Sequence, residues 1–195
     1  SALAAATVTI VPRHVLGGPG QTSPSDTFGA ALIGCGGRGP GTYSDMTKGL
    51  TVKQLAQCDV KFADKADNKT FYTDFRRVLD DKSIDVVFVA TPHHWHSPIA
   101  IPALIAGKDV YVEKPASHVL REGRLLVEAA KKHKRIVQHG TQMRSSEVTA
   151  KAREILESGL RGKVKMSKAW NVQRHSHRQP VADSEPPKGV DYDAW

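Results

Sequence analysis

The stretch FGAALIGCGGRG, Phe28–Gly39, decides the fold. It begins with a short apolar run, which is typical of a strand buried on both faces of a sheet. It ends with the glycine spacing GxGxxG at Gly34, Gly36 and Gly39, which lets the chain turn tightly from a strand into a helix and leaves backbone open to a pyrophosphate. The stretch therefore predicts a phosphate-binding turn, with a plain strand-to-helix turn as the alternative.

An acidic residue stands where such a turn needs one. Asp59 closes the next apolar segment, residues 51–60, and lies twenty residues beyond Gly39. A carboxylate there accepts hydrogen bonds from the ribose hydroxyls of adenosine and repels a 2′-phosphate, which favours NAD. Arg38 is a cation that can accommodate such a phosphate, so NADP stays an alternative. A methyltransferase that uses S-adenosylmethionine can show a similar glycine run.

Strand-like and helix-like segments alternate along most of the chain. Strands are expected over 28–34, 51–60, 85–92, 109–115 and 135–141, and helices over 39–50, 97–107, 117–134 and 146–159. This alternation implies an α/β fold with a Rossmann-type doubly wound parallel sheet. Residues 163–173 predict an amphipathic strand that opens a second, truncated α/β domain. We therefore expect a signal-like linker over 1–26, a dinucleotide-binding domain over 27–162 and an incomplete substrate domain over 163–195.

The first eleven residues, SALAAATVTIV, are apolar and mostly small. They resemble the hydrophobic part of an export signal, although no basic segment precedes them, and a linker rich in Pro, Gly and Ser follows as far as Asp26. A truncated export signal would make the protein periplasmic or exported. The alternative is an N-terminal arm on a cytoplasmic protein. The run is too short to span a membrane.

Composition argues against a nucleic-acid partner. The chain of 195 residues has 28 basic and 20 acidic residues, a formal charge of +8, but its basic residues are dispersed and aromatic residues make up only 6%. Stacking platforms for nucleic acid would need more aromatic rings among the positive charges. The two cysteines, Cys35 and Cys58, lie in apolar contexts and are predicted to be buried thiols.

Two further stretches end parallel strands at the carboxyl edge of the sheet, where ligands bind in such folds. They are ATPHHWH, residues 90–96, and VEKP, residues 112–115. With the glycine run, YTDFRRVLDD, EAAKKHKRIVQHGTQMRSS and the closing DYDAW, they make the chain resemble the Gfo/Idh/MocA family of NAD(P)-dependent oxidoreductases. The resemblance covers nearly the whole chain and is strongest to exported members that resemble sugar dehydrogenases.

The resemblance implies a role for each matching residue. Lys114 would be catalytic, hydrogen-bonding the substrate hydroxyl and helping its proton to leave, and Glu113 would hold the nicotinamide ribose. The cofactor-binding residues would be Gly34, Gly36, Gly37, Arg38, Gly39, Asp59, Thr91, Pro92, His96, Glu113 and Lys114. The substrate-binding residues would be Trp95, His96, Lys114, Gln142 and Arg144. A solvated ion pair is the structural alternative for Glu113 and Lys114.

His93, His94 and His96 form a dense cluster, but no Cys or His motif elsewhere supplies further ligands, so we expect no metal.

The segment between Val60 and Tyr72 is too short for a full crossover helix. We expect a shortened or partly missing helix there and, with it, a changed wall at the adenosine end of the cofactor site.

These observations predict an NAD(P)-dependent dehydrogenase that acts on CH–OH groups of a small sugar, polyol or related compound. Family members carry a substrate domain beyond the point where this sequence stops, so this chain alone is expected to bind NAD weakly and to turn over little. Association into a homo-oligomer through that domain is implied by the resemblance alone. The alternatives are a redox glycosidase of the same family and a non-catalytic NAD-binding fragment.

Overall fold

The structure, a computed structural model, describes residues 23, 26–65, 69–170 and 182–195. The expected export signal over residues 1–11 lies outside them, as does most of the linker that follows. The chain divides into two compact units. The first comprises residues up to Gly140 together with Gly189–Trp195, and the second comprises Thr141–Lys188. The domain boundaries expected from the sequence stay predictions.

The first unit is built on a six-stranded sheet in the order β3-β2-β1-β4-β5-β6, with every neighbouring pair parallel. Its strands are β1 (Phe28–Ile33), β2 (Val52–Cys58), β3 (Phe71–Tyr72), β4 (Val86–Val89), β5 (Asp109–Glu113) and β6 (Val137–Gly140). This is the strand order of a doubly wound Rossmann sheet. The predicted fold class is therefore confirmed.

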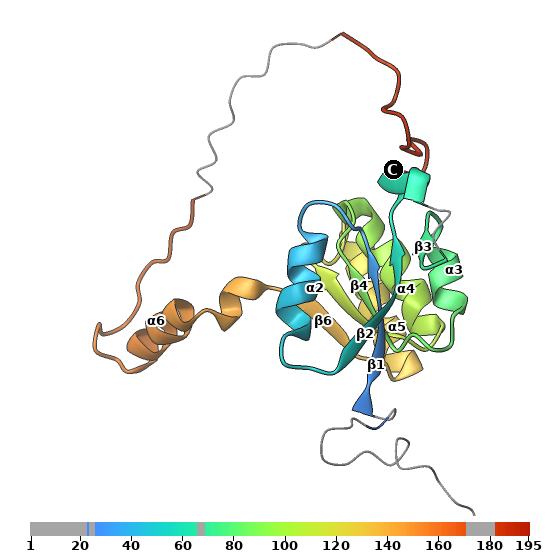
Figure 1. Ribbon diagram of the computed structural model, residues 1–195. Helices are drawn as coiled ribbons and strands as arrows, with labels where there is room; N and C mark the ends of the chain where they lie inside the picture. The colour runs from blue at the N-terminus through green and yellow to red at the C-terminus, as the bar shows by residue number, and fades with distance from the viewer. Residues whose placement is uncertain (1–22, 24–25, 66–68, 171–181) are drawn as a thin grey trace, which may run out of the picture. The chain divides into compact units, whose positions relative to one another are not determined.

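Helices cover both faces of this sheet. They are α2 (Gly39–Thr47), α3 (Phe75–Asp80), α4 (His96–Ile105) and α5 (Leu120–His133), with 3-10 turns η2 (Val60–Lys65) and η3 (His93–Trp95). In Figure 1, α2 lies on one face, whereas α3, α4 and α5 lie on the other. The four helices expected from the sequence include α2, α4 and α5, which are confirmed.

The apolar runs of the central strands are explained by this double cover. On the α4 face, Ile33 and Val87 are buried against Ile99 of the helix. On the α2 face, the ring of Phe88 lies 5.1 Å from that of Tyr43 and 5.8 Å from that of Tyr111. A strand with helices on both faces has no side open to solvent, so polar residues do not alternate along it.

The connection after β2 is short, as predicted. Its described residues include η2, which is kinked at Phe62, and the connection leads to the two-residue strand β3 at the sheet edge. Helix α3 follows, with the carboxylate of Asp74 accepting a hydrogen bond from the main-chain N–H of Arg76 at 2.9 Å. The sequence pattern assigned no element to β3 or α3, because one is very short and the other has under two turns of periodicity.

The described part of the second unit contains η4 (Gln142–Ser145) and α6 (Glu147–Glu157), which is the fourth expected helix. The strand predicted over 163–173 is wrong over its described residues, because 164–170 are irregular. A strand needs hydrogen bonds from a neighbouring strand, and the described residues of this unit include no other. No helix in the described ranges combines the length and apolar character that crossing a membrane requires.

Candidate cofactor and active site

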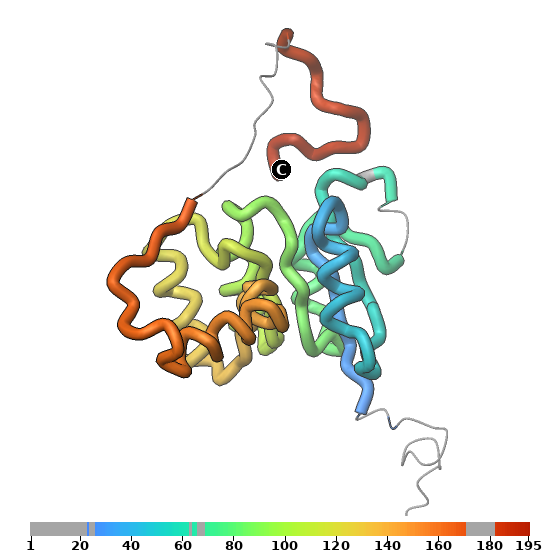
Figure 2. The backbone as a smooth tube through the Cα atoms, turned by 90° about the vertical axis from the view of Figure 1, so that its left-hand side faces the viewer, coloured from blue at the N-terminus to red at the C-terminus, as the bar shows by residue number. Residues whose placement is uncertain are grey.

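The glycine turn, residues 34–39, follows the carboxyl end of β1 and lies at the same end of the sheet as η2 (Figures 1 and 2). Gly34 has φ of +94°, and a Cβ there would lie 2.5 Å from the main-chain nitrogen of Thr91. A Cβ on Gly39 would collide with the carbonyl oxygen of Gly34. Gly36 differs, because no atom lies within 4 Å of its Cβ position. Two glycines thus close the turn, and the third leaves open space beside the backbone.

Asp59 ties this turn to the end of β2. Its Oδ2 accepts hydrogen bonds from the main-chain N–H groups of Cys35 at 2.7 Å and Gly36 at 3.2 Å, and its Oδ1 accepts one from Lys61 at 2.8 Å. The carboxylate also affects the neighbouring thiol. Burial first, and the charge of Asp59 second, raise the pKa of Cys35 to about 11. This thiol is therefore protonated at neutral pH.

A cavity of about 340 Å³ opens in front of the turn. Six predicted site residues line it: Gly34, Gly36, Asp59, Thr91, Pro92 and Trp95. The Oγ1 atom of Thr91 is buried and has no hydrogen-bond partner. A buried hydroxyl without a partner is costly, and a ligand in the cavity would supply one. Sequence reasoning assigned no role to Thr73, Asp74, Phe75 and Arg76, which also line the cavity, nor to the more distant Asp191, Ala194 and Trp195.

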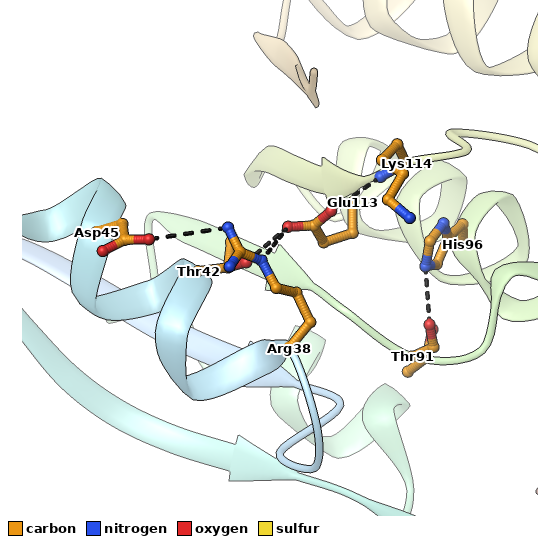
Figure 3. A network of polar contacts seen from close by, with 7 residues as sticks. All are labelled: Arg38, Thr42, Asp45, Thr91, His96, Glu113 and Lys114. Atoms are coloured by element: carbon orange, nitrogen blue, oxygen red, sulfur yellow. Dashed lines mark hydrogen bonds and ion pairs between the residues drawn. The ribbon is translucent and has the colours of Figure 1, made fainter. Parts of the chain in front are cut away.

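A second polar cluster lies at the end of β5 and is shown in Figure 3. Glu113 is only 4% exposed, and its Oε1 accepts a hydrogen bond from Thr42 Oγ1 at 2.6 Å. The same oxygen lies 3.5 Å from Arg38 Nε, and Oε2 accepts a hydrogen bond from the main-chain N–H of Lys114 at 3.1 Å. Arg38 also lies 3.8 Å from Asp45. A buried Glu113 does not fit the alternative of a solvated ion pair.

Thr42 was missed because its role depends on a partner 71 residues away. It lies in the first turn of α2 and is 1% exposed. A buried Thr in the first turn of a helix is a weak signal, since threonines also occur there for helix capping. The contact links the helix that follows the glycine turn to the strand that carries Glu113 and Lys114.

His96 joins the loops that follow β4 and β5. Its buried ring places Nε2 2.9 Å from the carbonyl oxygen of Thr91 and Nδ1 2.6 Å from that of Pro115. Each ring nitrogen therefore contacts a main-chain carbonyl oxygen of a different loop. Figure 3 shows Lys114 directly after β5 and His96 at the start of α4. The structure thus gives His96 a bridging position, and its direct contact with a ligand stays a prediction.

The histidine cluster does not converge. The ring of His93 stacks on that of His118 with centroids 5.7 Å apart, whereas His94 Nε2 lies 3.1 Å from the carbonyl oxygen of Trp195. Over the part of the chain that the structure describes, no three His, Cys, Asp or Glu side chains form a group that could hold a metal. Each histidine of the cluster instead contacts a different element.

The other predicted residues fall into two groups. Gly37, with φ of +47°, belongs to the turn, and Lys114 is exposed directly after β5. Neither residue lines the cavity. Gln142 and Arg144 lie in η4, which belongs to the second unit. They are therefore not among the residues that the first unit brings together, and their contact with substrate stays a prediction.

A doubly wound sheet with a glycine turn, an acid after β2 and a Glu–Lys pair at the end of β5 defines an α/β protein that binds a nucleotide cofactor. The model of the Gfo/Idh/MocA oxidoreductase family, with its NAD-binding Rossmann fold, matches residues 28–141, and the chain belongs to this family. The predicted family and the NAD-type cofactor are thereby confirmed.

The relatives that match include dehydrogenases and glycosyl hydrolase family 109 proteins. Levoglucosan dehydrogenase of Pseudarthrobacter phenanthrenivorans is 34% identical over 47% of this chain and 24% of its own length. Inositol 2-dehydrogenase of Salmonella typhimurium is 26% identical over 84% of this chain and 50% of its own length. The structure of myo-inositol 2-dehydrogenase from Lactobacillus plantarum matches with a TM-score of 0.62 and 27% identity, over 71% of this chain and 43% of that one. The chain thus spans half or less of the length of these relatives.

Proposed function

We propose that this chain forms the NAD-binding part of a dehydrogenase that moves hydride between NAD and a CH–OH group of a sugar or polyol. One observation carries the proposal. Along the carboxyl edge, Asp59 follows β2, the glycine turn follows β1 and Thr91 follows β4. Glu113 is the last residue of β5, and Lys114 follows it. This is the order in which an extended dinucleotide would meet an adenosine-ribose acid, a pyrophosphate turn and a catalytic lysine.

The cavity suits NAD better than NADP. Three carboxylates line it, Asp59, Asp74 and Asp191, against one cation, Arg76. The guanidinium of Arg76 already lies 3.2 Å from Asp74. Arg38, the cation that sequence reasoning connected with NADP, lies next to Glu113 and does not line the cavity. A 2′-phosphate would therefore enter surroundings of excess negative charge.

NAD, when bound, supplies the hydride acceptor, and the protein has to position and polarise the substrate hydroxyl. Lys114 is suited to this task because its main-chain N–H is held by buried Glu113 while its side chain is exposed at the strand end. Its ammonium group would hydrogen-bond the hydroxyl and help to carry its proton away. The names of the relatives support a sugar or polyol as substrate.

Binding is tested first. The chain is titrated with NAD and with NADP, and intrinsic tryptophan fluorescence and the unfolding midpoint Tm are recorded. We expect NAD to quench the fluorescence and raise Tm at concentrations at least about tenfold below those at which NADP does so. If neither dinucleotide changes fluorescence or Tm, the proposed function is wrong.

Turnover is then assayed with a panel of polyols and aldoses, in a form of the protein that includes a substrate domain, by the appearance of NADH. The Lys114→Met variant should lower kcat by at least about 100-fold while the Kd of NAD changes by less than about threefold. Cleavage of glycosides without net NADH would support the redox glycosidase instead. An unaltered kcat in the variant would remove Lys114 from the catalytic role.

A further inference from the structure

The outer wall of the cavity comes from a segment remote in sequence, Gly189–Trp195. The main-chain N–H of Asp191 donates a hydrogen bond to the carbonyl oxygen of Val60 at 3.0 Å. At the other end of the segment, His94 Nε2 lies 3.1 Å from the carbonyl oxygen of Trp195. Asp191 and Trp195 both line the cavity. Figures 1 and 2 both show the end of the chain beside η2.

Contacts inside the segment hold Trp195 in place. Asp191 Oδ1 accepts a hydrogen bond from the main-chain N–H of Ala194 at 3.1 Å, and the main-chain N–H of Trp195 donates to the carbonyl oxygen of Tyr192 at 3.3 Å. The rings of Tyr192 and Trp195 stack with centroids 6.3 Å apart. Half of the Trp195 surface nevertheless remains exposed. The indole is thus oriented by its neighbours and still offers surface to a ligand.

The Asp191 end of the segment lies on the β2 side of the cavity, and its Trp195 end contacts His94, which follows β4. Val60, which anchors the segment, directly follows Asp59 on the β2 side of the sheet, whereas Glu113 and Lys114 are two strands beyond β1 in the opposite direction. On the β2 side, the usual crossover helix is replaced by η2. Asp191 of the segment Gly189–Trp195 is thus anchored beside η2. This is where the short connection after β2 led us to expect a changed wall at the adenosine end of the cofactor site.

We propose that Gly189–Trp195 forms the adenosine wall of the cofactor site and that Trp195 packs against the adenine ring. This inference rests on the proposed function, that is, on NAD binding in this cavity. Phe75, Trp95 and Trp195 line the cavity, so two of the three tryptophans of the chain meet there. A gathering of aromatic rings beside a ribose-binding acid suits a flat purine base, which stacks on aromatic side chains.

The test uses the full chain and two fragments of the cofactor. The Trp195→Ala variant should weaken binding of ADP-ribose and of NAD by the same factor, about tenfold, and leave binding of nicotinamide mononucleotide unchanged. The Trp195→Phe variant keeps an aromatic ring and should stay within about threefold of the unmodified chain. Trp170→Ala is the matched control, because Trp170 is 71% exposed and lies outside the cavity lining. Kd values are measured by isothermal titration calorimetry, and circular dichroism checks that each variant is folded.

The outcomes separate the two proposals. If the unmodified chain binds neither NAD nor ADP-ribose, the proposed function fails, and this inference fails with it. If it binds both while Trp195→Ala behaves like Trp170→Ala, the adenosine wall is overturned and the proposed function stands. Tighter binding by Trp195→Ala would show that the segment obstructs the cavity, which also overturns the inference. Equal loss of nicotinamide mononucleotide binding would contradict the placement at the adenosine end.

Discussion

The hydroxyl of Thr42 donates a 2.6 Å hydrogen bond to the buried carboxylate of Glu113. This contact joins α2, which begins at the glycine turn, to the last residue of β5. This hydrogen bond to a charged acceptor therefore links the phosphate end and the catalytic end of the proposed site, together with the contact of Arg38 with the same carboxylate. Such bonds contribute more than neutral ones because a buried charge left without a partner is costly.

The Thr42→Val variant should lower the free energy of unfolding by about 1.5–3 kcal/mol, since it removes the hydrogen bond and keeps the shape. Thr47→Val on the same helix is the control, because that hydroxyl donates to the carbonyl oxygen of Tyr43 and contacts no charge. The free energy of unfolding of this control should decrease by about 1 kcal/mol or less. Urea unfolding measures both. Equal decreases in the free energy of unfolding for both variants would mean that the hydrogen bond from Thr42 does not stabilise the buried carboxylate of Glu113.

Two alanine substitutions in the glycine turn should have opposite effects: one should lower stability, and the other should weaken NAD binding. Gly34→Ala should lower the free energy of unfolding by more than about 2 kcal/mol, because Gly34 has positive φ and its Cβ position is occupied by backbone. Gly36→Ala should change it by less than about 0.5 kcal/mol, yet weaken NAD binding more than about tenfold by filling the space beside the turn.

Gly41→Ala serves as the control for these two variants, since its Cβ also meets open space but lies within α2. Gly41→Ala should raise the free energy of unfolding by up to about 1 kcal/mol, because alanine has the higher helix propensity, and should leave NAD affinity unchanged. Urea unfolding and NAD titration supply both quantities. A Gly36→Ala variant with full NAD affinity would exclude the pyrophosphate from this side of the turn.

Substitution of Thr91 should weaken NAD binding without lowering the stability of the ligand-free chain. Its Oγ1 is buried without a partner, so Thr91→Val should leave the free energy of unfolding unchanged or raise it by up to about 1 kcal/mol in the absence of ligand. The same change should weaken NAD binding by roughly fivefold to tenfold, and Thr91→Ser should restore most of the affinity. Thermal unfolding with and without NAD measures both effects. A destabilised Thr91→Val chain without ligand would show that the hydroxyl is satisfied internally.

The two thiols should be unreactive while the chain is folded. Burial is the main cause that raises the pKa of Cys35 to about 11 and that of Cys58 to about 12. At pH 8, iodoacetamide should therefore modify them more than about tenfold more slowly than in urea-unfolded chain, where thiols ionise near their ordinary pKa. Mass spectrometry over time measures the rates. Similar rates in both states would show that the thiols are accessible.

The same pKa shifts predict how these thiols affect stability. Because both pKa values are raised in the folded state, the unfolded state loses its protons first as the pH rises. Their contribution to stability is full below about pH 9 and decreases as the pH approaches the folded pKa values. Replacing both cysteines with alanine should therefore make the free energy of unfolding decrease less steeply as the pH rises above about 9.

Features set by neighbouring residues were predictable. The apolar run before Gly34 indicated a doubly covered strand, and the spacing of Gly34 and Gly39 indicated a tight turn, because both properties arise within a dozen residues. The strand predicted over 163–173 is wrong over its described residues for the converse reason. Alternating apolar residues are compatible with a strand, but a strand also requires a partner, which local sequence does not reveal.

The sequence by itself determined the Rossmann fold, the turn at Gly34–Gly39 and the acid that follows β2, because strand, turn and helix preferences act between near neighbours. Only the tertiary structure decided that Thr42 supports Glu113 and that Asp191 and Trp195 line the cavity beside Val60. These contacts join residues far apart in the chain. They depend on how strands are ordered and where a returning segment is anchored, and no local pattern encodes either.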